Sequence, residues 1–396
     1  MVDLAAAVLP LSLYVHLPWC VRKCPYCDFN SHALSGAPLP EREYIDALLR
    51  DVALTALTTN TRSLRSIFIG GGTPNLFSAA AIGHLLDGVA HHFTLASDAE
   101  ITLEANPGAA EAQRFIGYRD AGINRLSLGV QSLDDGLLQT LERIHTADEA
   151  RQSIGAAFNV FPCVNLDFMF ALPGQTMDML GTMLREVCAF NAPHLSFYQL
   201  TLEPHTPFHH VPPEPMPDAD AAASMQEHVE GILANAGYAR YEVSAYAQPG
   251  AMCAHNLNYW QFGDYLGIGA GAHGKQSFFD SEGQIIRVAR TIKQPHPRRY
   301  MDAARTALET AVVESRTIKR DEFAFEFMLN ALRLKNGVPR TYFPERTGIP
   351  LSEIASMAQD AVARGLLEPD DAIFRTTELG WRFLNDTVQC FLTDGR

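Results

Sequence analysis

Leu11-Ser-Leu-Tyr-Val-His-Leu17, followed by Pro-Trp-Cys20-Val-Arg-Lys-Cys24-Pro-Tyr-Cys27, is the stretch of sequence that decides the fold. Its first seven residues are mostly apolar and predict a buried β-strand. Three cysteines then follow with C-x3-C-x2-C spacing. Iron–sulfur clusters are held by cysteine thiolates, and four thiolates would close a four-iron cluster. Three leave one iron open to a substrate, so the motif predicts a [4Fe–4S] cluster on Cys20, Cys24 and Cys27.

Zinc is the alternative metal for these cysteines. A structural zinc site needs four thiolate or imidazole ligands, and His16 or His32 would have to complete the set. Zinc motifs usually pair their cysteines as C-x2-C…C-x2-C, which this spacing does not match. The sequence therefore favours the cluster over zinc.

Short apolar runs alternate with longer helix-like stretches through the first half of the chain. Strands are predicted over Leu11–Leu17, Ser66–Gly70, Glu100–Ala105, Arg125–Gln131, Val164–Phe170 and Leu195–Leu200. Helices are predicted over Arg42–Leu57, Ala79–His92, Ala110–Ala121, Ala147–Phe158 and Met177–Phe190. Six such repeats predict an α/β fold with a parallel sheet, either a partial or full (β/α) barrel or a flat doubly wound sheet.

The polar motifs of this region follow or end the predicted strands. Gly70-Gly-Gly-Thr-Pro74, Glu104-Ala-Asn-Pro107 and Gln131-Ser132 each stand at a strand end, and Asp167 lies within the fifth strand. Barrel enzymes build their sites at the carboxyl ends of the strands, so these motifs favour a barrel whose mouth holds the site. A carboxylate in an apolar strand is costly unless it is paired, which makes Asp167 a candidate site residue.

The second half of the chain is organised differently. Six prolines within Pro204–Pro217 predict a loop, which is followed by a predicted helix over Asp218–Ala236 and a glycine-rich stretch over Gly263–Gly274. The last part is predicted to form helices over Arg320–Leu334, Arg340–Thr347 and Leu351–Arg364, then a hairpin over Leu366–Thr377. We expect a barrel over residues 1–203, a linker and barrel-completing segment over 204–316, and a small, mainly helical, winged-helix-like domain over 317–396.

Composition excludes several classes of function. The formal net charge is −14, which argues against binding to duplex nucleic acid or to transfer RNA, because such binding draws on positive charge. No apolar run is long enough to span a bilayer. Met1–Pro10 contains no Lys or Arg, so we expect no secretory signal and a cytoplasmic protein. The seven cysteines are odd in number and partly clustered, which suggests metal binding more than disulfides.

Tyr14-Val-His-Leu-Pro-Trp-Cys20, Cys27-Asp-Phe29 and the Gly-Gly-Gly-Thr-Pro run together resemble the radical S-adenosylmethionine (SAM) superfamily. More narrowly, they resemble the branch of oxygen-independent coproporphyrinogen III oxidases and heme chaperones (HemW). The resemblance covers almost the whole chain. It implies that SAM binds at the open iron and is cleaved to a 5′-deoxyadenosyl radical, a reactivity that the cofactor supplies. The implied SAM contacts are Tyr14, Tyr26, Gly71, Gly72, Thr73, Glu104, Gln131, Arg143 and Asp167.

Some of these residues have ordinary alternative roles. The glycine run is not followed by Lys-Ser/Thr, so it is not a phosphate-binding P-loop. Arg143 has the planar fork that binds a carboxylate, although an arginine on a helix is more often a surface charge. Glu104 alone would read as a solvated carboxylate, and Tyr14 alone as strand core.

Three features separate the oxidase branch from the chaperone branch. The oxidases resemble C-x3-C-x2-C-x-C, whereas Phe29 stands at the fourth cysteine position here. They also carry a long N-terminal extension, of which this chain has about ten residues. His255-Asn256-Leu-Asn-Tyr259-Trp260 resembles the H-N-x-x-Y-W signature of the chaperones. The resemblance therefore implies a chaperone that binds a [4Fe–4S] cluster, SAM and heme. Whether it also turns over a substrate is left open; as an enzyme it would be a coproporphyrinogen dehydrogenase.

His255 is the candidate heme ligand, because imidazole is a usual axial ligand of heme iron and the neighbouring aromatic side chains can pack on a porphyrin. A histidine beside aromatic residues is nevertheless more often a satisfied structural group. Cys253 is a rival ligand, whereas His209 and His210 are expected to be solvated. The expected partners are heme-accepting proteins and a reductant, with no integral membrane segment but possible peripheral contact with membrane heme proteins.

Overall fold

The computed structural model describes residues 9–59, 62–108, 113–306 and 311–393. All six predicted strands of the first half are present and run parallel, side by side in sequence order. They are β1 (Leu11–Leu17), β4 (Leu64–Gly71), β5 (Leu95–Ala105), β6 (Arg125–Gln131), β7 (Cys163–Phe170) and β8 (His194–Gln199). The structure thus confirms the α/β fold with its parallel sheet.

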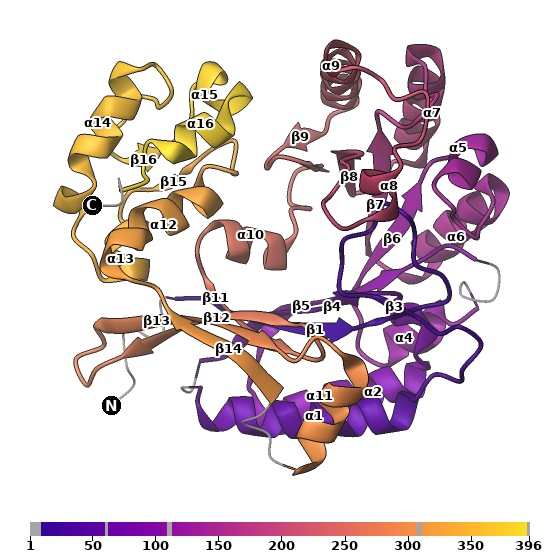
Figure 1. Ribbon diagram of the computed structural model, residues 1–396, viewed down its shortest axis with the longest axis horizontal. Coiled ribbons are helices and arrows are strands. Elements are labelled where there is room, and N and C mark those ends of the chain that lie inside the picture. Colours follow the sequence, from indigo (N-terminus) through magenta and orange to yellow (C-terminus); the bar gives the residue numbers. More distant parts are fainter. Residues whose placement is uncertain (1–8, 60–61, 109–112, 307–310, 394–396) are drawn as a thin grey trace.

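The order of these strands decides between a barrel and a flat sheet. Parallel crossovers are right-handed, so strands that follow one another without a reversal place all their helices on one face. A doubly wound sheet needs a reversal of strand order, and none occurs between β1 and β8. Figure 1 shows the helices along the outside of a curved sheet. These helices are α1 (Glu41–Leu57), α2 (Ala79–His92), α4 (Phe115–Asp120), α5 (Asp135–Thr140), α6 (Ala147–Val160), α7 (Met177–Phe190) and α9 (Ala219–Asn235).

Two details of the helix prediction are corrected. The predicted helix over Ala110–Ala121 begins at Phe115 in the structure, and its residues 110–112 lie outside the described residues. The short helix α5 was not predicted; it begins where the Asp134 side chain caps the backbone N–H of Leu137. A capping aspartate of this kind marks a helix start that a periodicity argument overlooks in so short a segment.

The sheet continues beyond both edges of the predicted six strands. β11 (Asp264–Ile268) pairs parallel to β1, and β12 (His273–Phe279), β13 (Ile285–Lys293) and β14 (Val312–Thr317) extend it in antiparallel fashion. At the other edge lie β10 (Ala245–Ala247) and β9 (Ala239–Arg240). The edge strands β14 and β9 are not paired with each other, so this barrel is partial.

Strand β11, which contains Gly267, was not predicted. The sequence indicated a glycine-rich stretch over Gly263–Gly274 but no strand within it. In the structure, a Cβ at Gly267 would lie 2.1 Å from the carbonyl oxygen of His273. Glycine is therefore required where β11 and β12 approach closely, although its presence usually weakens a strand prediction.

Side chains of β1 alternate between two environments, as a strand requires. Leu11, Leu13 and Val15 pack into the apolar core beneath the helices, whereas Ser12 and His16 are buried on the opposite face, inside the barrel. Strong burial on the helix side fixes the register of β1. The register of β1 therefore determines where the strand ends, and Cys20 follows this end by three residues.

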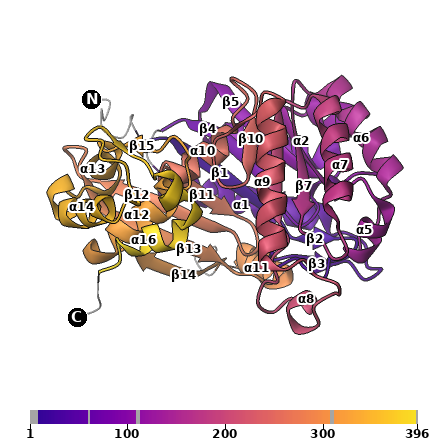
Figure 2. The ribbon, with the colours of Figure 1, turned by 90° about the horizontal axis from the view of Figure 1, so that it is seen from above.

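Shorter elements connect and flank the barrel. They are β2 (Trp19–Cys20), β3 (His32–Ala33), the 3₁₀ turn η1 (Pro74–Leu76), α8 (Pro207–His210), α10 (Ala254–Trp260) and α11 (Pro297–Thr306). Figures 1 and 2 show α10 between the barrel strands and the C-terminal elements. Within the described residues, no helix has the length and apolar character needed to cross a bilayer.

The C-terminal part forms its own apolar core around Phe327 and Phe343, and this core includes Phe262 and Val288 from the barrel side. Its elements are η3 (Arg320–Glu322), α12 (Phe323–Ala331), β15 (Val338–Pro339), α13 (Tyr342–Thr347), η4 (Leu351–Glu353), α14 (Ala355–Ala363), β16 (Ile373–Phe374), α15 (Glu378–Arg382) and α16 (Leu384–Gln389).

The predicted hairpin over Leu366–Thr377 is corrected in part. Leu367 and Thr376 do form an antiparallel bridge, but the strand β16 pairs with β15, which lies more than thirty residues earlier. The two-stranded ribbon therefore joins distant segments, which local sequence patterns do not reveal.

Candidate iron–sulfur and SAM site

A cavity of about 400 Å³ opens at the carboxyl ends of the barrel strands. All three motif cysteines line it, and so do eight of the nine residues implied as SAM contacts. Those eight are Tyr26, Gly71, Gly72, Thr73, Glu104, Gln131, Arg143 and Asp167. Residues from β4, β5, β6 and β7 thus meet the cysteines at one mouth, as the positions of the motifs at strand ends predicted.

The three cysteines are brought together by a short loop that begins at β2. Cys20 ends β2, which pairs with β3, and the backbone N–H of Cys27 donates to the carbonyl of Cys24 over 3.1 Å. Burial raises the pKa of the Cys20 and Cys27 thiols, while hydrogen bonds from Ser31 oppose the rise. Without a metal these thiols are therefore protonated at neutral pH, and metal binding must release their protons.

The glycine turn after β4 packs directly against this loop. Gly71 has a φ of +115°, and a Cβ there would lie 2.5 Å from the His16 ring. A Cβ at Gly72 would lie 2.5 Å from the carbonyl oxygen of Trp19. The N–H groups of Gly72 and Thr73 donate to the carbonyls of Leu17 and Trp19 over 2.8 and 2.7 Å. The glycines thus allow the close backbone approach that holds the cysteine loop at the cavity.

Two carboxylates face the same cavity. Glu104 accepts a hydrogen bond from the Gly71 N–H over 3.0 Å, and burial, with a contribution from Asp167, raises its pKa to about 7. Asp167 accepts from the Ser127 hydroxyl over 3.0 Å and from the Asn165 amide over 2.7 Å; burial raises its pKa too. Two carboxylates with raised pKa values in one cavity suit a positively charged ligand.

Arg143 brings the positive charge of the site. Its guanidinium donates to Asn106 Oδ1 over 2.6 Å and to the Gly129 carbonyl over 2.8 Å, and it lies 3.7 Å from the Cys24 sulfur. Its Nε is buried and has no hydrogen-bond partner. Arg143 lies in the turn after α5 and not on a helix, so it is neither helical nor a surface charge. The guanidinium lines the cavity and brings a positive charge to it, which suits an anionic ligand group.

Gln131 occupies the end of β6 in an unusual backbone conformation. Its φ is +68°, and its side-chain oxygen accepts a hydrogen bond from the Tyr198 hydroxyl over 2.5 Å. Non-glycine residues with positive φ are uncommon and gather at functional sites. This conformation directs the amide of Gln131 into the cavity that it lines.

Two further residues line the cavity beside the implied SAM contacts. Asn106 links Thr73 Oγ1, over 3.1 Å, to Arg143, and Tyr198 lines the wall beside Gln131. Asn106 belongs to the strand-end motif Glu104-Ala-Asn-Pro107, whereas Tyr198 was not singled out and only its place near the end of a predicted strand could have indicated it. The contacts of both residues join distant segments, so their partners could not be predicted from local sequence.

Tyr14 does not line this cavity. Its hydroxyl contacts His16 Nδ1 at 2.7 Å, and its ring stacks on Phe68 deeper in the barrel. His16 Nε2 contacts the carbonyl of Asn30 at 2.8 Å, so both imidazole nitrogens of His16 are engaged. His32 does not line the cavity either. The histidines proposed to complete a zinc site are therefore not placed to do so.

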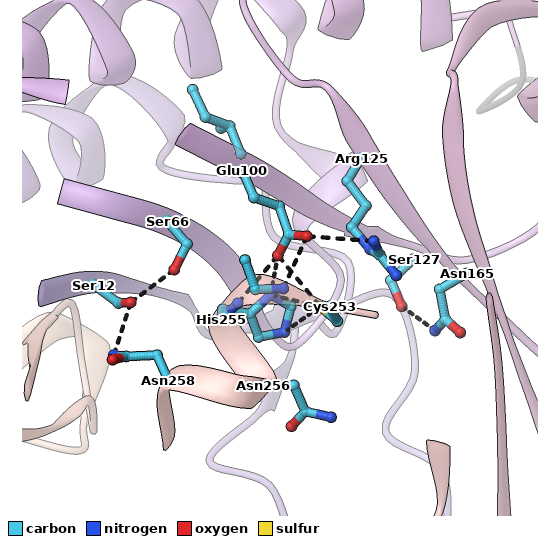
Figure 3. A network of polar contacts seen from close by, with 12 residues as sticks. Ser12, Ser66, Glu100, Arg125, Ser127, Asn165, Cys253, His255, Asn256 and Asn258 are labelled. Carbon is cyan, nitrogen blue, oxygen red and sulfur yellow. Dashed lines mark hydrogen bonds and ion pairs between the residues drawn. The ribbon is translucent and has the colours of Figure 1, made fainter. Parts of the chain in front are cut away.

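His255 belongs to a separate polar network, shown in Figure 3. It lies on α10, and its ring contacts Glu100 of β5. Glu100 precedes Glu104, which lines the cysteine cavity, by four residues, so the two residues are about 13 Å apart along the strand. The His255 ring stacks on Phe68 with 4.1 Å between ring centroids. The structure therefore does not bring His255 to the cysteine cavity, whereas His209 and His210 are exposed as expected.

Comparison with known proteins agrees with this geometry. Residues 14–187 match the family described as the Radical SAM superfamily, and residues 318–383 match the HemN C-terminal domain. The heme chaperone HemW of Escherichia coli (strain K12) is 46% identical over 386 residues, covering 97% of this chain and 99% of its own. The heme chaperone HemW of Haemophilus influenzae (strain ATCC 51907 / DSM 11121 / KW20 / Rd) is 43% identical over 390 residues, covering 97% and 98%.

One solved structure bears on the fold. Coproporphyrinogen III oxidase (HemN) from Escherichia coli, described as a radical SAM enzyme, superposes with a TM-score of 0.80 over 99% of this chain and 92% of its own, at 21% identity. At that identity the likeness concerns the fold alone. The full-length relatives, by contrast, settle the family, and the chain belongs to the radical SAM superfamily and, within it, to the heme chaperone HemW family.

Proposed function

We propose that this protein is a heme chaperone that binds a [4Fe–4S] cluster, SAM and heme, and passes heme to acceptor proteins. The observation that carries the cofactor part is the convergence of Cys20, Cys24 and Cys27 on one cavity with Arg143 and Glu104. Three thiolates suit three irons of a four-iron cluster and leave the fourth iron for SAM.

Each side of the cavity then has a chemical task. The cysteines hold the cluster, and the small residues of the glycine turn allow a ligand to approach the backbone. Arg143 offers its guanidinium charge to the SAM carboxylate, while Glu104 and Asp167 offer negative charge to its cationic groups. When bound, the reduced cluster and SAM supply the radical chemistry, and the protein supplies orientation and shielding.

The chaperone function is favoured over coproporphyrinogen oxidation by the residues and by the relatives. Phe29 stands at the position of the oxidases' fourth cysteine; it lines the cavity and is 58% exposed. The full-length relatives from Escherichia coli and Haemophilus influenzae carry the name heme chaperone. Heme-accepting proteins and a reductant are the partners that this function requires.

His255 remains a predicted heme ligand, but heme could reach it only if neighbouring groups moved. Its side chain is 12% exposed, with Nδ1 at 3.0 Å from Glu100 and the ring stacked on Phe68. A porphyrin on this imidazole requires α10 or Phe68 to move, so heme ligation at His255 would have to be accompanied by a rearrangement there. A change of the heme spectrum in His255→Ala but not in Cys253→Ala would support the prediction.

The experiment that tests the function combines two assays on one anaerobic preparation. In the first, the protein is titrated with heme; in the second, it receives reductant, SAM and coproporphyrinogen III, with porphyrins separated by chromatography. We expect stoichiometric heme binding and no protoporphyrinogen. The Escherichia coli coproporphyrinogen III oxidase serves as the positive control for turnover. Robust formation of protoporphyrinogen, or the absence of stoichiometric heme binding, would refute the chaperone function.

A further inference from the structure

We propose that Glu100, Cys253 and His255 form a second metal site, one that takes a zinc ion or a similar divalent transition metal, away from the cysteine cavity. Their ligand atoms lie within 4.8 Å of one another. The Cys253 sulfur lies 3.3 Å from Glu100 Oε1 and 3.0 Å from His255 Nδ1. Glu100 Oε1 and His255 Nδ1 are 3.0 Å apart. Figure 3 shows the three side chains converging where α10 meets β5.

These separations are close to those of a metal site. Zinc lies about 2.0–2.3 Å from its sulfur, nitrogen and oxygen ligands, which at tetrahedral angles puts the ligand atoms about 3.3–3.7 Å apart. The three atoms therefore need to spread by only a few tenths of an ångström to admit the ion. Three protein ligands leave a fourth position for water or another group, and the side chains of Glu100 and His255 are 13% and 12% exposed.

The surroundings hold two of the ligands in place before any ion arrives. The Glu100 carboxylate accepts hydrogen bonds from the backbone N–H groups of Ala254 and His255 over 3.0 and 3.2 Å, and it pairs with Arg125 at 3.3 Å. The His255 ring is fixed by its stack on Phe68. Partners that orient the ligands in this way raise metal affinity.

The chemical types of the three ligand atoms indicate which metal ion the site would bind. A thiolate and an imidazole suit zinc and its transition-metal neighbours, whereas magnesium and calcium prefer sites made of oxygen ligands. Binding breaks the S–H bond of Cys253, forms a metal–sulfur bond and releases one proton to solvent. The ion would then tie α10, which carries His255-Asn256-Leu-Asn-Tyr259-Trp260, to β5 of the barrel. The inference does not rest on the cluster or on SAM, but it shares His255 with the predicted heme ligation, so the ion and heme would compete for this imidazole.

The alternative is that the three groups only hydrogen-bond to one another, with Glu100 anchoring the start of α10. A titration with Co²⁺ separates the two, because a Co²⁺–thiolate bond gives a charge-transfer band and tetrahedral Co²⁺ gives strong visible bands. The full-length chain is used with Cys20, Cys24 and Cys27 all replaced by Ser, so that the cysteine cavity offers no thiolate. Circular dichroism and thermal unfolding without metal verify that each variant folds.

We expect one Co²⁺ per chain with the charge-transfer band, its displacement by Zn²⁺, and a higher melting temperature with Zn²⁺. Adding Cys253→Ser should abolish the band, while Cys188→Ser, which changes a thiol on α7, should leave it intact. Glu100→Gln, a second variant that keeps the hydrogen-bonding shape, should weaken binding at least tenfold. Absence of the band in the parent, or its persistence in the Cys253→Ser variant, would overturn the proposal.

Discussion

Glu104 and Asp167 place two carboxyl groups in one cavity, and this arrangement costs stability when both are ionised. The pKa of Glu104 rises from 4.5 to about 7 through burial and the neighbouring Asp167. The native state therefore holds a proton on Glu104 more tightly than the unfolded chain does. Between pH 4.5 and 7 the native state binds more protons, so stability falls as the pH rises through this window.

Replacing Glu104 by Gln should remove this penalty, because the amide oxygen still accepts from the Gly71 N–H but carries no charge. We expect the free energy of unfolding of the metal-free variant to exceed that of the wild type by up to roughly 3 kcal/mol at pH 8, and by much less at pH 5. Denaturant unfolding at the two pH values measures the difference. Glu43→Gln, which changes an exposed carboxylate on α1, is the control and should show no such pH dependence. A gain that does not grow with pH would contradict the explanation.

Arg143 should be the residue whose loss weakens SAM binding most directly. A charge-assisted hydrogen bond contributes about 1.5–3 kcal/mol, so Arg143→Ala should reduce calorimetric affinity roughly ten- to a hundredfold. Arg143→Lys keeps the positive charge but lacks the planar guanidinium that binds a carboxylate through two hydrogen bonds. Its affinity for SAM should therefore lie between those of Arg143→Ala and the wild type. Arg151→Ala is a suitable control, because Arg151 pairs with Glu186 outside the cysteine cavity. Unchanged affinity in Arg143→Ala would exclude Arg143 from the SAM site.

At the scale of elements, the glycine turn after β4 connects the sheet to the cysteine loop. A Cβ at Gly72 would lie 2.5 Å from the Trp19 carbonyl, which is backbone and cannot rotate away. Gly72→Ala should therefore push the loop away from β4 and destabilise the fold by about 1–3 kcal/mol, the usual cost of overpacking. It should also lower the iron content after anaerobic reconstitution.

The matched control for this substitution lies on a helix. Gly155 is exposed on α6, and a Cβ there would meet nothing within 4 Å. Gly155→Ala should leave the iron content unchanged and stabilise the fold by about 0.5–1 kcal/mol, because alanine favours helices. Thermal unfolding and iron analysis of both variants make the comparison. Equal behaviour of the two alanine variants would show that the turn does not position the loop.

The elements differ in how well local sequence predicts them. The six parallel strands are mostly buried and contain short apolar runs, so the sequence alone located them, although β5 begins at Leu95, five residues before its predicted start. β11 could not be located this way, because Gly267 is needed for contact with His273 across the sheet. The pairing of β15 with β16 likewise joins residues far apart in the chain. Convergence of the motifs, including Asn106, was predictable from strand ends, whereas the place of Tyr198 in the cavity became apparent only in the structure.

At the scale of the whole molecule, the C-terminal helices share an apolar core with the end of the barrel. Phe327 on α12 is fully buried and packs against Phe262 and Phe343, with ring centroids 5.5 and 5.3 Å apart. A core that contains residues from both parts couples their unfolding. We therefore propose that the predicted segments 1–203, 204–316 and 317–396 unfold together, even though the helical part has its own family match.

Phe327→Ala should test this coupling. Removing a buried Phe side chain typically costs about 3–5 kcal/mol, and here the loss should lower the stability of the barrel as well as of the C-terminal helices. Unfolding is followed by circular dichroism and by the cluster's visible absorbance, which reports the barrel. We expect the two transitions to shift together. A shift in the helical signal alone would indicate two independently folding units.

The central claim is that Cys20, Cys24 and Cys27 bind a four-iron cluster whose open iron takes SAM. The most direct test is anaerobic reconstitution followed by iron and sulfide analysis and by electron paramagnetic resonance of the reduced protein, with and without SAM. We predict close to one four-iron cluster per chain, a spectrum that changes when SAM is added, and no cluster when the three cysteines are replaced together by Ala. A full cluster in the triple variant, or a spectrum indifferent to SAM, would contradict the claim.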